Sequence, residues 1–140
     1  MRHLVKGRKL NRTSSHRSAL MSNLSISLVK HKRIVTTEPK AKELRRFIER
    51  LITYAKKDNL HGRRLIMSKI KGNLKKEVAN TLIHDIAPNY SDRNGGYTRI
   101  IKLANRKNDD ASMSIIEFVN LQTNDSETDK KEEVKEDNKE

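Results

Sequence analysis

The distribution of charge leaves only the middle of this 140-residue chain able to fold around a core. The first seventeen residues, MRHLVKGRKLNRTSSHR, have six basic side chains and almost nothing apolar, and the chain is almost wholly polar from Thr123 onward. Such segments bury too little to offset their conformational entropy. We therefore expect a basic arm over residues 1–13, one domain over residues 14–120 with a modest core of Leu, Ile and Val, and a disordered acidic tail over residues 121–140.

The N-terminal region contains basic residues but no acidic ones until Glu38. Its nine Lys and Arg residues are Arg2, Lys6, Arg8, Lys9, Arg12, Arg17, Lys30, Lys32 and Arg33. Such a segment repels itself, so an anionic partner must order it, and each cation placed on a phosphate releases counterions. Residues 121–140 have a net charge of −4, so the chain's +13 leaves +17 on residues 1–120. A charge of that size points to nucleic acid.

Other classes of partner have less support. No apolar run approaches the roughly 18–20 residues of a spanning helix, and no apolar segment of a signal peptide follows the basic N-terminus, so we expect no membrane partner and no secretion. The absence of cysteine excludes disulfides and thiolate sites and fits a reducing cytosol. The histidines, none of which pairs with another at helical spacing, are His3, His16, His31, His61 and His84. We therefore expect neither a metal nor a cofactor.

The apolar pattern predicts alternating helices and strands. Leu20, Leu24 and Leu28 follow the hydroxyl-rich Thr13–Ser15 at four-residue spacing, and Asp92–Gly96 is the strongest turn signal. Helices are expected over about 14–30, 38–57, 61–71 and 75–86, and strands over 34–37, 97–103 and 113–119, the last two as an antiparallel hairpin. The predicted fold class is α/β (α+β), with the order α-β-α-α-α-β-β and about four helices on one face of a small three-stranded mixed sheet.

Two motifs look like catalytic or phosphate-binding motifs. Ser14 and Ser15 lie beside His16 as a nucleophile would lie beside a base, but adjacent residues at a helix start do not face each other, so we favour a helix cap. Gly95–Gly96 lacks the GK[ST] sequence of a phosphate loop. These glycines suit a turn with positive φ, and they are also compatible with close approach to RNA beside Arg93, Tyr97 and Arg99. We expect no catalytic site.

Three basic pairs lie on the predicted helices. Lys75–Lys76 suits a solvated face, Arg63–Arg64 is a candidate phosphate contact, and Arg45–Arg46 has no assigned role. A DNA-binding regulator that uses the third and fourth helices as a helix-turn-helix is the alternative class, although these helices are less charged than the arm. A basic extension on a small globular anchor is more typical of RNA assembly proteins. An RNA-modifying enzyme would need a catalytic constellation that this sequence lacks.

Three segments resemble the bacterial large-subunit ribosomal protein L17 family: MRHLVKGRKLNRTSSHRSAL, TTEPKAKELRRFIERLITYAK and APNYSDRNGGYTRIIKL. The similarity continues through MSIIEFV and covers about residues 1–120. It implies a non-enzymatic structural constituent of the large subunit, in the cytoplasm, that binds the large ribosomal RNA near the nascent-peptide tunnel exit, supports assembly and translation, and has neighbouring ribosomal proteins as partners but no small-molecule substrate. It also implies a small domain with three strands and several helices.

The resemblance assigns RNA contacts to two motifs. The N-terminal motif comprises Arg2, His3, Lys6, Gly7, Arg8, Lys9, Arg12, Thr13, Ser14, Ser15, His16 and Arg17, and the second motif comprises Arg93, Asn94, Gly95, Gly96, Tyr97, Thr98 and Arg99. From charge alone we add Lys30, Lys32 and Arg33, with Arg63 and Arg64, as candidate rRNA contacts. The family usually stops soon after the last strand. The acidic tail either is a solvated extension or shields the arm from wrong RNA.

Overall fold

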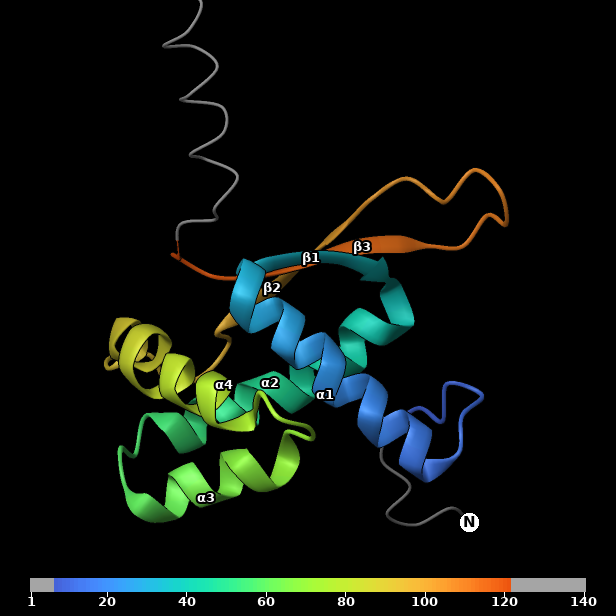
Figure 1. Ribbon diagram of the computed structural model, residues 1–140. Coiled ribbons are helices and arrows are strands. Elements are labelled where there is room, and N and C mark those ends of the chain that lie inside the picture. Colours follow the sequence, from blue (N-terminus) through green and yellow to red (C-terminus); the bar gives the residue numbers. More distant parts are fainter. Residues whose placement is uncertain (1–6, 122–140) are drawn as a thin grey trace, which may run out of the picture.

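The computed structural model describes residues 7–121. Helices lie on one side of a small sheet, and the hairpin of its last two strands projects beyond them (Figure 1). The elements in chain order are α1 (Ser14–His31), β1 (Arg33–Thr37), α2 (Glu38–Ala55), α3 (Leu60–Lys69), α4 (Lys75–Thr81), a π-helical turn η1 (Leu82–Ile86), a 3-10 turn η2 (Ala87–Tyr90), β2 (Thr98–Lys102) and β3 (Met113–Phe118). The predicted α+β fold is confirmed.

The sheet has the strand order β1-β3-β2 and is antiparallel throughout, so the expectation of a mixed sheet was wrong. The predicted hairpin of β2 and β3 is confirmed. β1 and β2 run in the same direction, but β3 lies between them, so they form no parallel ladder. Ile34 and Ile100 both lie opposite Ile116, which gives an apolar row on the face that the helices cover.

The strongest periodic stretch forms α2, as predicted. Its first turn contains Glu38 and a proline, where the missing N–H does no harm, and the preceding Thr37 is extended. The residues that α2 buries recur every three or four positions: Ala41, Leu44, Ile48, Leu51, Ile52 and Ala55. This stripe makes α2 the central helix of the domain.

The helix starts depend on local hydrogen bonds that differ from the predicted ones. α1 begins at Ser14 as expected, but Thr13 makes no capping hydrogen bond, and its hydroxyl lies 3.4 Å from that of Ser15 instead. α3 begins just before the expected His61 because the Asn59 side chain accepts a hydrogen bond from the Gly62 N–H at 2.6 Å. A Cβ atom on Gly62 would lie 2.5 Å from the Tyr54 carbonyl oxygen, so only glycine fits between α3 and the end of α2.

The predicted helix over 75–86 is α-helical only as far as Thr81. A π-helical turn and then a 3-10 turn follow. Pro88 has no N–H to donate to the preceding turn, so the regular hydrogen-bond pattern cannot continue through it. This change of pitch still buries Leu82 and Ile86.

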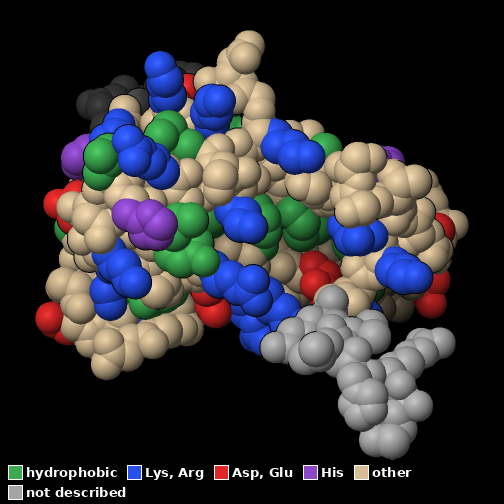
Figure 2. Space-filling model, turned by 90° about the horizontal axis from the view of Figure 1, so that it is seen from below, with side chains coloured by type: hydrophobic (Ala, Val, Ile, Leu, Met, Phe, Trp, Pro, Cys, Tyr) green, Lys and Arg blue, Asp and Glu red, His purple; other side chains and the backbone are tan. Residues whose placement is uncertain are grey.

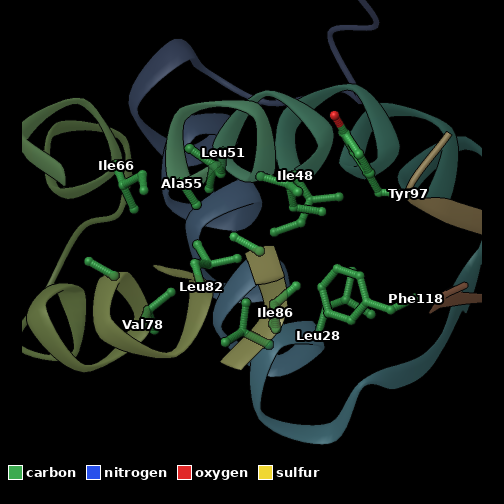
Figure 3. Packing of buried hydrophobic residues seen from close by; sticks show 14 of the residues in the cluster. Leu28, Ile48, Leu51, Ala55, Ile66, Val78, Leu82, Ile86, Tyr97 and Phe118 are labelled. Atoms are coloured by element: carbon green, nitrogen blue, oxygen red, sulfur yellow. The ribbon is translucent and has the colours of Figure 1, made fainter. Parts of the chain in front are cut away.

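The core lies where α1, α2 and the α4–η1 segment meet the inner face of the sheet. Figure 3 shows Leu28, Ile48, Leu82, Ile86 and Phe118 converging there, all with little or no exposure. At its edge the buried Tyr90 hydroxyl donates a 2.6 Å hydrogen bond to the Val119 carbonyl oxygen, and its ring lies 5.2 Å from that of Tyr97. Burial raises the pKa of Tyr90 to about 12. These contacts anchor the residues beside the second motif.

Candidate nucleic-acid interface

The described part of the N-terminal motif folds back against the start of α1. Gly7 has φ 87°, as expected for a tight turn, and Leu10 and Asn11 have φ 53° and 50°. The Arg12 N–H donates to the Lys9 carbonyl oxygen at 3.1 Å, and Arg17 Nη1 donates to the Arg12 carbonyl oxygen at 3.0 Å. Arg17 therefore helps to hold this turn. Arg2, His3 and Lys6 lie outside the described residues.

This turn forms one wall of a groove of about 690 Å³, here called the arm groove, whose other walls are α1, α2 and the end of α3. Among the described residues 7–121, the only acid in its lining is Glu43. Its cationic lining comprises Arg8, Lys9, Arg17, Arg46, Arg50 and Lys69. Charges of one sign in a concave site reinforce one another and raise the local concentration of anions.

The N-terminus of α1 adds polar donors to the arm groove. Ser14 lines the groove, the first turn of α1 contains no acidic residue, and the Thr13 side chain leaves the first N–H groups uncapped. The positive end of the helix dipole lies here. Ser15 and His16 are exposed in the same turn. The prediction that the Thr13–Ser15 hydroxyls cap these N–H groups was therefore wrong.

A second groove of about 520 Å³, here called the turn groove, lies between α2 and the second motif. It is lined by Arg46, Glu49, Arg50, Thr53, Gly95 and Tyr97. Arg46 and Arg50 also line the arm groove, because residues four apart lie on one face of a helix. Thr98 supports this arrangement by a 3.2 Å hydrogen bond to the Glu49 carboxylate. The two motifs are thus joined by side chains of α2.

The turn before β2 is fixed by its own hydrogen bonds. Lys56 Nζ donates to the Arg93 carbonyl oxygen at 2.6 Å and lies 5.6 Å from the Tyr97 ring centroid, while Arg93 Nε donates to the Gly95 carbonyl oxygen at 3.1 Å. Gly95 and Gly96 have φ 150° and 61°, so the prediction of a turn that needs positive φ is confirmed. A Cβ atom at either glycine would meet nothing within 4 Å, so this backbone is open on its outer side. Asn94 is exposed beside it.

Arg33 and Arg99 lie on the opposite face of the sheet from the helices. Each is the cross-strand neighbour of Glu117, which is only 4% exposed. Arg33 Nε lies 3.1 Å from Glu117 Oε2, and Arg99 Nε donates to Glu117 Oε1. One carboxylate therefore holds two of the predicted RNA contacts away from both grooves.

The remaining predicted contacts also lie apart from the grooves. Lys30 lies 3.8 Å from Glu77, and Lys32, with φ 63°, ends α1, where burial lowers its pKa. These residues are separated from the arm by the 18-residue helix, which is about 27 Å long. The Arg63 guanidinium donates to the Asn80 side chain of α4, and Arg64 is exposed.

The face of the molecule that lies at the bottom in Figure 1 includes α3 and the N-terminal end of α1. Figure 2 shows Lys and Arg side chains spread over that face among hydrophobic and some acidic ones. Among residues 7–121 no group of three His, Asp or Glu side chains is placed to hold a metal ion. No helix within that range is long and apolar enough to cross a bilayer.

Sequence reasoning missed the residues that connect the motifs. Arg46 was noted only as half of a basic pair, and neither Arg50 nor Lys69 was assigned a role. The four-residue spacing of Arg46 and Arg50 on the polar side of a strongly periodic helix was the available signal. Which groove such a face borders depends on packing between distant segments.

The fold and the grooves together define a small basic α+β protein with a cationic surface that runs from the N-terminal turn across α2 to the turn before β2. A sequence model of the family "Ribosomal protein L17" matches residues 20–119. This chain belongs to that family, whose members are structural proteins of the large ribosomal subunit. The predicted location in the ribosome, in the cytoplasm, follows from this membership.

Several relatives bear the name "Large ribosomal subunit protein bL17". The relative from Orientia tsutsugamushi (strain Ikeda) is 55% identical over 119 residues, which cover 85% of this chain and 80% of that one. The relative from Sulfurovum sp. (strain NBC37-1) is 55% identical over 119 residues, covering 85% of this chain and all of that one. The relative from Rickettsia canadensis (strain McKiel) is 50% identical over 139 residues and 99% of both chains.

Proposed function

We propose that this protein binds the large ribosomal RNA through one continuous surface, made by the basic arm, α2 and the Arg93–Tyr97 turn of the second motif, and so supports assembly of the large subunit. The observation on which this rests is that Arg46 and Arg50 line both the arm groove and the turn groove. Through these two side chains, the cationic groups of the N-terminal turn and the turn before β2 border one continuous surface, although the two turns are far apart in sequence. RNA phosphates that tertiary folding forces together need this kind of neutralisation.

Different groups perform different parts of the binding. Arg8, Lys9, Arg46 and Arg50 neutralise phosphates, and the uncapped N–H groups at the start of α1 donate hydrogen bonds that fix register. Gly95 and Gly96 offer backbone that RNA can approach without meeting a side chain. Arg2, His3 and Lys6, which precede the N-terminal turn in the sequence, supply further positive charges for RNA phosphates. Most of the affinity is then electrostatic and falls with rising salt.

The proposal includes a place in the particle. The resemblance of the N-terminal and second motifs supports a location near the nascent-peptide tunnel exit, beside other large-subunit proteins. It also supports a role without enzymatic activity. The charge and apolar pattern of the sequence, not the resemblance, supports the division into an arm at 1–13, a domain at 14–120 and an acidic tail at 121–140. No observation favours the free-regulator alternative, because the α3–α4 pair uses the Arg63 guanidinium internally, on Asn80.

Neutralising the arm tests the proposal. Arg8→Gln/Lys9→Gln removes two exposed charges of the arm groove, and Lys75→Gln/Lys76→Gln removes two exposed charges outside both grooves. We expect only the first pair to weaken binding to large-subunit rRNA and to lower the salt slope of the affinity by roughly 1 to 2. Equal affinity and slope for the two pairs would refute a role for the arm. Sucrose-gradient sedimentation of the unaltered chain with the large subunit independently tests its association with that subunit.

A further inference from the structure

The face of the sheet that points away from the helices presents a continuous row of aliphatic side chains. Val35 and Ile101 lie on either side of Ile115, on three adjacent strands, and they are 58% and 39% exposed. Leu103, which is 41% exposed, donates its N–H to the Met113 carbonyl oxygen at 3.0 Å, so these two residues form the next row. None of the described helices covers this side of the sheet (Figure 1). A clustered aliphatic surface of this kind marks an interaction site.

The same face has a cationic row beside the aliphatic one. It is formed by Arg33, Glu117 and Arg99, which lie opposite one another. Arg33 and Arg99 come two residues before Val35 and Ile101 on their strands, and Glu117 comes two residues after Ile115. One carboxylate between two guanidiniums leaves one positive charge in excess. The Arg99 side chain is 64% exposed, so it still presents N–H donors outward while bound to Glu117. A guanidinium with free donors is well suited to a second carboxylate.

RNA, a second copy of the chain, the acidic tail and another protein are the candidates for binding this face, and the aliphatic and cationic rows distinguish among them. RNA bases stack on aromatic side chains, but this row is aliphatic. A second copy of the chain would bring the excess positive charge of one Arg33–Glu117–Arg99 row against that of another, and residues 1–120 already have a charge of +17. The acidic tail has the right charge, but Val134 is its only aliphatic residue beyond Leu121. A protein segment with both aliphatic and acidic side chains satisfies both rows.

We propose that the outer face of the sheet docks a segment of another large-subunit protein, which lays aliphatic side chains over Val35, Ile101 and Ile115 and places an Asp or Glu against Arg99. The choice of partner rests on the proposed function, whereas the chemistry of the segment rests on the two rows. The RNA-binding surface and the protein-binding surface then lie on opposite sides of the domain. RNA contacts α2 and the turns, and a neighbouring protein covers the sheet.

Site-specific photocrosslinking in assembled subunits tests this proposal. The full chain is expressed with p-benzoylphenylalanine in place of Val35 or, separately, of Ile101, and large subunits are purified and irradiated. We expect both positions to crosslink to the same segment of one protein, and mass spectrometry of the linked peptide should show aliphatic residues beside an Asp or Glu. The same probe at the exposed His84 of η1 should not label that segment. Arg99→Gln should lower the yield at Val35 several-fold, and Arg99→Lys should restore most of it.

The other occupants are distinct outcomes of the same experiment. Crosslinks to RNA, to residues 122–140, to a second copy, or to a segment without a carboxylate would each overturn the docking proposal, as would no crosslink at either position. Before the crosslinks are interpreted, sedimentation establishes whether the unaltered chain binds the large subunit. A chain that sediments there but gives one of these outcomes refutes the docking surface alone, whereas a chain that stays free refutes the proposed function.

Discussion

Arg46 and Arg50 lie one turn apart on α2, and each lines both the arm groove and the turn groove. The N-terminal motif and the second motif are separated by most of the domain in sequence, yet these two side chains border both. The exposed Arg45 is next to Arg46 and lines neither groove. Position on the helix, not charge alone, decides which arginine belongs to the surface.

Replacing these arginines should therefore have unequal effects. We expect Arg46→Ala and Arg50→Ala each to weaken rRNA binding and to lower the salt slope by about 1, the effect of one lost phosphate contact. Arg45→Ala should leave both quantities unchanged. All three side chains are exposed, so unfolding free energies should stay within about 0.5 kcal/mol of the wild type. Filter binding at several salt concentrations measures the slopes, and an Arg45→Ala effect equal to the others would argue against a defined path.

Glu117 should contribute more to stability than an exposed acid does. Glu117→Gln keeps the shape but leaves Arg33 and Arg99 without their shared carboxylate, and we expect it to lower the unfolding free energy by roughly 1–3 kcal/mol. Glu77→Gln, which removes the exposed partner of Lys30, should cost less than about 0.5 kcal/mol. Urea denaturation of both variants gives the comparison, and equal losses would contradict the role assigned to Glu117.

Gly62 should tolerate no side chain. In Gly62→Ala the added Cβ lies 2.5 Å from the Tyr54 carbonyl oxygen, so α3 must shift away from α2, and we expect a loss of about 1–3 kcal/mol. Arg64→Ala, at an exposed position of the same helix, is the control and should change stability by less than about 0.5 kcal/mol. Thermal unfolding distinguishes the two, and a Gly62→Ala protein as stable as the control would mean that the helices do not approach this closely.

Tyr90 should make the fold sensitive to alkaline pH. Its pKa is raised from 10.0 to about 12, so the folded state holds the proton more tightly than the unfolded state does. The stability that this difference in pKa contributes is fully present below pH 10 and is lost as the pH rises toward 12, by up to about 3 kcal/mol. Other groups titrate in the same range, so the test is the difference between wild-type and Tyr90→Phe unfolding free energies. That difference should shrink between pH 10 and pH 12. If the two unfolding free energies instead change with pH in parallel, burial does not raise the pKa of the Tyr90 hydroxyl.

The sequence predicted those features that local pattern determines. The spacing of Leu44, Ile48 and Leu51 indicated α2, and Asp92–Gly96 indicated the turn, because each depends on neighbouring residues alone. The π-helical turn before Pro88 was missed because it depends on how a hydrogen-bond pattern adapts between a buried stripe and a proline. The shared Arg46–Arg50 face was missed because it exists only when α2 packs between the N-terminal turn and the residues before β2.

Because this chain has no cysteine, a single introduced cysteine can report whether the two grooves face the same RNA. A cysteine replacing Ser18 in the arm groove, or Thr53 in the turn groove, can carry a tethered iron chelate that cleaves nearby RNA in reconstituted large subunits. Asn108→Cys in the exposed loop between β2 and β3 is the control. If the arm groove and the turn groove form one RNA-binding surface, the Ser18 and Thr53 probes will cleave overlapping stretches of the large rRNA, distinct from any cut by the Asn108 probe. Cleavage of unrelated stretches from Ser18 and Thr53, or none from either, would contradict it.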